Sequence, residues 1–97
     1  MARNVAGLGG IDMKNREYCQ VREEYEVDGR TAYVVADDQV AWTCWKEDWD
    51  AAVEEYGHLD SVESYAEFCH RAGYLRYDAP EAHQKIIEMG ATNWNWA

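Results

Sequence analysis

The dipeptide Asp28-Gly29 stands between two runs of alternating apolar and polar residues, and it constrains the fold more than any other feature of this sequence. Glycine tolerates the positive φ that a type I′ turn requires, so such a dipeptide is the strongest short signal for a β-hairpin. The alternation predicts strands over residues 16–27 and 31–36. Four apolar residues are expected together on one face of the first strand: Cys19, Val21, Tyr25 and Val27.

Asp37-Asp38 interrupts the alternation, which resumes over residues 39–45 and predicts a third strand. The three strands together predict an antiparallel meander. The apolar period then lengthens to that of a helix, and it predicts three amphipathic helices: from Trp45 to Tyr56, from an Asp60–Glu63 cap to just before Gly73, and from an Asp78 cap to Gly90. The apolar stripe of the second helix is expected to contain Val62, Tyr65, Ala66 and Cys69.

Strands followed by helices indicate an α+β domain, in which two or three helices pack on one face of the sheet. We expect this domain over residues 16–97, after a flexible, glycine-containing arm over residues 1–15. A domain of this size supports one modest core and leaves no room for a deep two-lobed cleft, which favours a binding protein over an enzyme. The chain shows neither a long apolar run nor a secretory signal, so we expect it in the cytoplasm, away from membranes.

The cysteines and histidines show no spacing typical of a metal site or of a cofactor site. Cys19, Cys44 and Cys69 are an odd number, so we expect reduced, buried thiols and no disulfide framework. Cys69 and His70 point about 100° apart on a helix and cannot readily share one ion, so Cys69 is expected in the core and His70 in water. The hypothesis of a small enzyme or metal protein stays open through Cys44, paired with a distant histidine as a nucleophile.

The negative charge of the chain is concentrated in its middle third. Residues 37–70 hold ten acids and one base, whereas the formal charge of the whole chain is −10. This balance excludes direct binding to a nucleic-acid backbone and favours a basic partner. Acids four apart on a helix, such as Asp50 and Glu54, repel one another at a separation of about 6 Å, on the scale of neighbouring charges in nucleic acid.

Nine acids of this segment are the candidate partner-binding residues: Asp37, Asp38, Glu47, Asp50, Glu54, Glu55, Asp60, Glu63 and Glu67. The alternative is an ordinary solvated helix face. Five Trp and seven Tyr exceed what so small a core can bury, which favours exposed aromatic anchors beside the acids. Trp94 and Trp96 are the candidates, although their alternation with Asn is equally typical of a short final strand.

The hairpin EYEVDGRTAYVVADD, the acidic helices and the run LDSVESYAEFC resemble small acidic DNA-mimic proteins of phages and mobile elements, in particular anti-CRISPR inhibitors of type I surveillance complexes. The block EDWDAAVEEYGHLDSVESYAEF is also similar to antirestriction proteins of the ArdA kind. The resemblance covers residues 24–73, and the glycine-containing arm and the Trp-containing tail depart from it.

The resemblance implies a stoichiometric inhibitor that occupies the groove in which a bacterial defence complex binds DNA. Its target would be a basic DNA-binding protein such as the Cas8-like subunit, which reads the protospacer-adjacent motif. The role of phosphates would fall to Glu47, Asp50, Glu54, Glu55, Asp60, Glu63 and Glu67, opposite Lys and Arg of that target. The alternative function is an adaptor or inhibitor that binds a basic surface through exposed aromatics, without mimicry of DNA.

Overall fold

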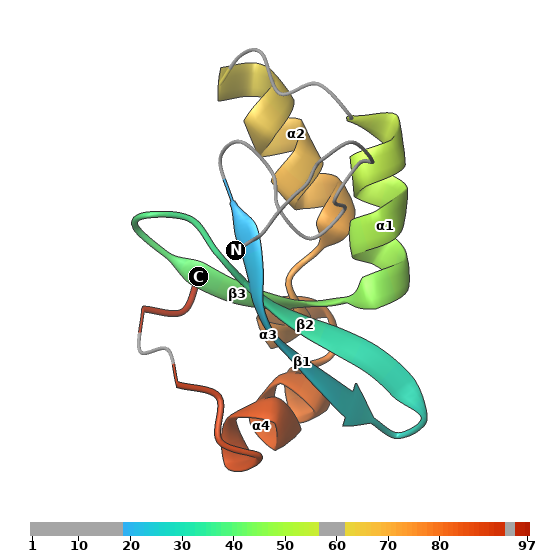
Figure 1. Cartoon of the computed structure of the whole chain (residues 1–97), viewed down its shortest axis with the longest axis vertical. Coiled ribbons are helices and arrows are strands. Elements are labelled where there is room, and N and C mark those ends of the chain that lie inside the picture. Colours follow the sequence, from blue (N-terminus) through green and yellow to red (C-terminus); the bar gives the residue numbers. More distant parts are fainter. Residues whose placement is uncertain (1–18, 57–61, 93–94) are drawn as a thin grey trace, which may run out of the picture.

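The computed structural model describes residues 19–56, 62–92 and 95–97, so the arm expected at residues 1–15 lies outside the described residues. The predicted meander is confirmed: strands β1 (Gln20–Val27), β2 (Arg30–Ala36) and β3 (Ala41–Trp45) form an antiparallel sheet in the order β1-β2-β3 (Figure 1). Asp28 and Gly29 have φ values of 53° and 81°, and this pair of positive values is what a type I′ turn requires.

The described helices follow the sheet in the chain, which confirms the α+β class. They are α1 (Lys46–Glu55), α2 (Val62–Ala72), the short α3 (Leu75–Asp78), which the sequence pattern did not predict, and α4 (Pro80–Glu88). The predicted Asp78 cap is wrong, because Asp78 ends α3 and Ala79 takes the capping position of α4. Asp60 and the side chain of Glu63 lie outside the described residues, and so does their predicted cap.

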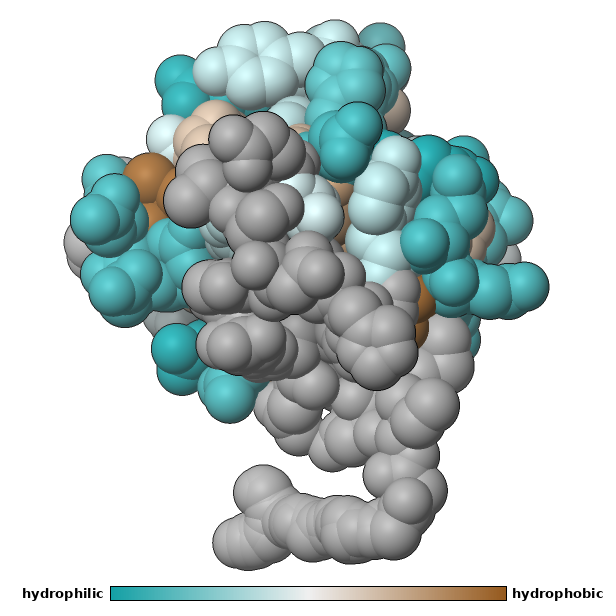
Figure 2. Space-filling model, turned by 90° about the horizontal axis from the view of Figure 1, so that it is seen from above, coloured by the Kyte–Doolittle hydropathy of each residue, from teal (hydrophilic) through white to brown (hydrophobic). Residues whose placement is uncertain are grey.

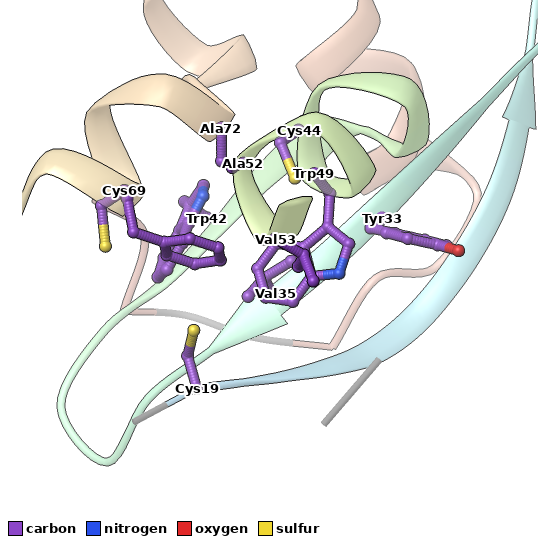
Figure 3. Close-up of a cluster of buried hydrophobic side chains, with 11 residues drawn as sticks. Cys19, Tyr33, Val35, Trp42, Cys44, Trp49, Ala52, Val53, Cys69 and Ala72 are labelled. Carbon is purple, nitrogen blue, oxygen red and sulfur yellow. The ribbon is translucent and has the colours of Figure 1, made fainter. Parts of the chain in front are cut away.

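The helices cover both faces of the sheet, which corrects the expectation of a single covered face. The α1–α2 side packs on Tyr33 and Val35, and α4 packs on Ala32 and Val34 of the same strand (Figure 1). Figure 3 shows the first of these cores around Trp49. The Trp49 ring also meets the ring of Phe68 edge to face. Both faces of the sheet are covered because the run TAYVVA of β2 has no polar alternation. Such a run is typical of a strand buried on both sides.

A β-bulge divides β1 between the two cores. Val21 pairs with Val35 and Glu23 with Val34, so Arg22 is an extra residue that the partner strand does not match. As a result Cys19 and Val21 join the core under α1 and α2, whereas Tyr25 and Val27 join the core under α4. The expectation that these four residues share one face is therefore wrong, because the extra residue reverses the facing of the second half of the strand.

The apolar stripe of α2 also differs from the predicted one. Ala66 is exposed, and the buried positions are Phe68, Cys69 and Ala72, with Tyr65 packed against them. His70 is exposed, as predicted. All three cysteines are buried and free of disulfides, which confirms the expectation for their state.

Candidate acidic interface

Three of the predicted acids form a row along α1. Glu47, Asp50 and Glu54 fall within about 60° of one another around the helix, at successive rises of about 4.5 and 6 Å. Trp49, Ala52 and Val53 are buried on the opposite side of the helix. We call Glu47, Asp50 and Glu54 the α1 acidic row. Figure 2 looks down on the end of the molecule that carries α1 and α2, where the described surface is mostly hydrophilic.

The far end of this row is unfavourable for the helix itself. Glu54 lies in the last turn of α1, which contains no basic residue, and carboxylates there oppose the negative end of the helix dipole. The row also places Asp50 and Glu54 four residues apart, where like charges destabilise a helix. Among the described residues, no cation lies within ion-pair distance of Glu54. Local helix stability therefore gives no reason for a carboxylate at this position.

The other two acids of the row hold cations of this chain. Glu47 binds Arg30, and the Oδ2 atom of Asp50 lies 2.5 Å from the Nζ atom of Lys46. Glu47 also occupies the first turn of α1, where a carboxylate favours the helix dipole. The Glu47 and Arg30 side chains are 69% and 48% exposed, and pairs this exposed contribute little to stability and exchange readily for other partners.

Glu55 points to another side of α1, toward α2, and does not belong to the row. Its Oε2 atom lies 2.5 Å from the Nε atom of Arg71, whose Nη1 atom is 3.7 Å from Asp48. The hydrogen bond to Glu55, with the charges of Glu55 and Asp48, raises the pKa of Arg71. Arg71 thus links α2 to α1 and offsets part of the negative charge of this side.

The carboxylate of Asp37 is used within the fold. It accepts hydrogen bonds from the N–H groups of Gln39 and Val40 at 2.8 and 2.7 Å, and from the Tyr65 hydroxyl at 2.8 Å. Partial burial acts to raise the pKa of Asp37, but these hydrogen bonds outweigh burial and lower it. We therefore assign Asp37 to the β2–β3 turn and its connection to α2, and leave it out of the proposed interface.

The remaining acids are spread over other elements. Asp38 is exposed in the β2–β3 turn and Glu67 is exposed on α2. Asp60 and the side chain of Glu63 lie outside the described residues. The structure thus gathers three of the nine candidate acids into one row. The four-residue spacing of Asp50 and Glu54 was the signal in the sequence that pointed to part of it.

Trp96 packs into the molecule and is not an exposed anchor. Its ring meets that of His83 edge to face at 5.2 Å, and it contacts the core under α4. The backbone on either side of it pairs with Ala41 in a parallel bridge, so residues 95–97 match the alternative expectation of a final strand-like segment. Trp94 lies outside the described residues. Among the residues that the structure describes, the exposed large apolar side chains are instead Tyr77 and Met89, which the sequence pattern did not single out.

The described residues give little support to the hypotheses of catalysis and metal binding. These residues contain no group of three or more His, Cys, Asp or Glu side chains arranged to hold a metal ion. Burial raises the pKa of the Cys44 thiol, and nearby carboxylates raise it further, whereas a nucleophilic cysteine needs a lowered pKa. Cys44 is also fully buried and inaccessible to a substrate.

Among the described helices, none has the length and apolar character needed to cross a membrane. Comparisons of the chain with protein-family models, with curated proteins and with solved structures found no match.

Proposed function

We propose that this chain is a non-catalytic, stoichiometric inhibitor of a bacterial DNA-binding defence complex, which it blocks by placing a DNA-mimicking acidic surface in the groove for DNA. The observation that carries the proposal is the position of Glu54. Its carboxylate is exposed, opposes the helix dipole and repels Asp50, so it lowers the stability of α1. Locally unfavourable residues of this kind are expected where a protein performs its function.

The α1 acidic row would face lysines and arginines that normally hold DNA phosphates. Glu47 can take part because its exposed ion pair with Arg30 is weak enough to be exchanged for a cation of the target. Asp50, whose side chain is 30% exposed, adds its negative charge to the row beside Lys46. A type I CRISPR surveillance complex from a phage-infected host, bound at the Cas8-like subunit that reads the protospacer-adjacent motif, is the target we favour. The alternative of an adaptor that binds through Trp94 and Trp96 loses support from the packing of Trp96.

The test is a competition assay with a purified type I surveillance complex and a labelled duplex that carries its protospacer-adjacent motif. We expect the wild-type chain to displace the duplex, and Glu54→Lys to weaken this displacement about tenfold. Glu88→Lys is the matched control, because it makes the same charge change at an exposed position of α4, on the other side of the sheet.

Raising the salt concentration from about 50 to about 500 mM should weaken inhibition steeply, because the attraction is between exposed charges. Equal effects of Glu54→Lys and Glu88→Lys, or an affinity that does not change with salt, would contradict the proposal.

A further inference from the structure

A groove lies between the β1–β2 turn and the start of α4. It is an open groove with a volume of about 490 Å³, and its lining combines the indole of Trp45 and the apolar Ala79 and Pro80 with the acidic residues Asp28 and Glu81. We call it the Trp45 groove. Arg30 is part of this lining and forms an ion pair with Glu47 of the α1 acidic row. The groove is therefore continuous with the interface proposed above.

The group that occupies the indole face belongs to this chain. The Cζ atom of Arg30 lies 3.9 Å from the centroid of the Trp45 ring, and its guanidinium also binds Glu47. An aromatic face with a neighbouring carboxylate is an environment that suits arginine better than lysine, because the planar guanidinium stacks and donates at the same time. The Arg30 side chain is 48% exposed, so its ion pair with Glu47 contributes little to the stability of the fold.

The charge around the groove favours a cation. Asp28 and Glu81 are exposed at its rim, where the Nζ atom of Lys85 lies 2.9 Å from Asp28. The hydrogen bond to Asp28, with the charges of Asp28 and Glu81, raises the pKa of Lys85. Asp78, also in the lining, directs its carboxylate to the backbone N–H of Tyr74. Acidic residues thus outnumber the cations here, so a positively charged side chain is attracted and a phosphate is repelled.

We propose that an arginine side chain of the basic partner replaces Arg30 on the Trp45 ring and enters this groove. The inference rests on the proposed function and adds to it a contact selective for arginine beside the α1 acidic row. Arg30 is then an internal competitor, which leaves the indole face and Glu47 when the arginine of the partner arrives. The phosphate-mimicking row supplies attraction for any cation, whereas the indole face distinguishes a guanidinium from an ammonium.

Titration calorimetry with hexa-arginine and hexa-lysine peptides at low salt tests this inference. Arg30→Gln should bind hexa-arginine about three- to tenfold more tightly than the wild type, because it removes the competitor, and should gain less for hexa-lysine. Arg22→Gln is the matched control: it removes the same charge from an exposed position on β1 that does not line the groove. We expect it to change both affinities equally and less than about twofold.

Trp45→Phe, checked for folding by circular dichroism, should reduce the preference for arginine over lysine, because phenylalanine offers a weaker face to cations. Equal gains in Arg30→Gln and Arg22→Gln, or an equal gain for both peptides, would overturn the inference. If either of these calorimetry results is found while Glu54→Lys still weakens inhibition, only the groove proposal is refuted. If Arg30→Gln gains affinity selectively for hexa-arginine but Glu54→Lys inhibits as well as the wild type, the proposed function is refuted instead.

Discussion

The Nδ1 atom of His83 on α4 lies 2.8 Å from the Oγ1 atom of Thr43 in β3, and both side chains are buried. The same imidazole meets the ring of Trp96, which holds residues 95–97 against the edge of β3. This contact connects β3, an edge strand of the sheet, to α4 on the face away from α1. Because both side chains are buried, this hydrogen bond has consequences for stability.

We predict that the fold loses stability as the pH falls below about 6.5. Burial lowers the pKa of His83, and the charge of Arg76 lowers it further. Because the folded pKa is below the unfolded value of 6.5, the unfolded chain binds the proton first. The contribution of neutral His83 is therefore complete above the unfolded pKa and is lost as the pH falls toward the folded pKa. Urea unfolding at pH 7.5 and 5.5 measures the loss.

The control for this prediction is His70→Gln, since His70 is exposed. It should retain the pH dependence, whereas His83→Gln should remove most of it. Thr43→Val, which leaves the imidazole without its partner, should lower the free energy of unfolding by about 1–3 kcal/mol at neutral pH. A pH dependence that persists unchanged in His83→Gln would contradict this account.

The Asp37–Tyr65 hydrogen bond should couple the β2–β3 turn to α2. Each of Asp37→Asn and Tyr65→Phe is expected to destabilise the fold by about 0.5–2 kcal/mol, and the double variant should cost less than the two single changes together. The folded pKa of Asp37 is lowered, so its contribution is present above the unfolded pKa and lost as the pH falls through the folded pKa. Asp38→Asn is the matched control, because Asp38 is exposed; strictly additive effects would rule out the coupling.

Deletion of Arg22 should disrupt the fold more than its replacement by alanine. The deletion removes the bulge, so either Cys19 and Val21 or Tyr25 and Val27 must turn away from their core. Arg22→Ala keeps the backbone count and should change stability by less than about 0.5 kcal/mol, because the side chain is exposed. Thermal unfolding compares the two variants, and similar midpoints would show that the bulge does not set the facing of β1.

Arg71→Gln should leave the unfolding midpoint almost unchanged and strengthen inhibition. Its ion pairs with Glu55 and Asp48 are exposed and stabilise the fold only weakly, but Arg71 offsets their charge beside the proposed interface. The competition assay with the defence complex should therefore show a lower concentration for half displacement. A variant that inhibits less well than the wild type would place Arg71 in the interface itself.

The hairpin at Asp28-Gly29 and the extent of α1 were predictable because each depends on residues close in the sequence. A type I′ turn requires a positive φ at two adjacent positions. The apolar residues of an amphipathic helix recur every three or four residues. Part of the α1 acidic row was predictable for the same reason. By contrast, Arg30 and Glu47 are seventeen residues apart, and their pairing has no counterpart in any local pattern.

The sequence by itself determined the class of the fold, the order of its strands and the outward side of α1, since periodicity and turn chemistry act over a few residues. Only the tertiary structure decided that α4 covers the second face of the sheet and that Arg22 forms a bulge. It also decided which carboxylates of α1 bind cations of this chain. The physical reason is that burial on two faces, strand register and ion pairing depend on segments that meet only after the chain has folded.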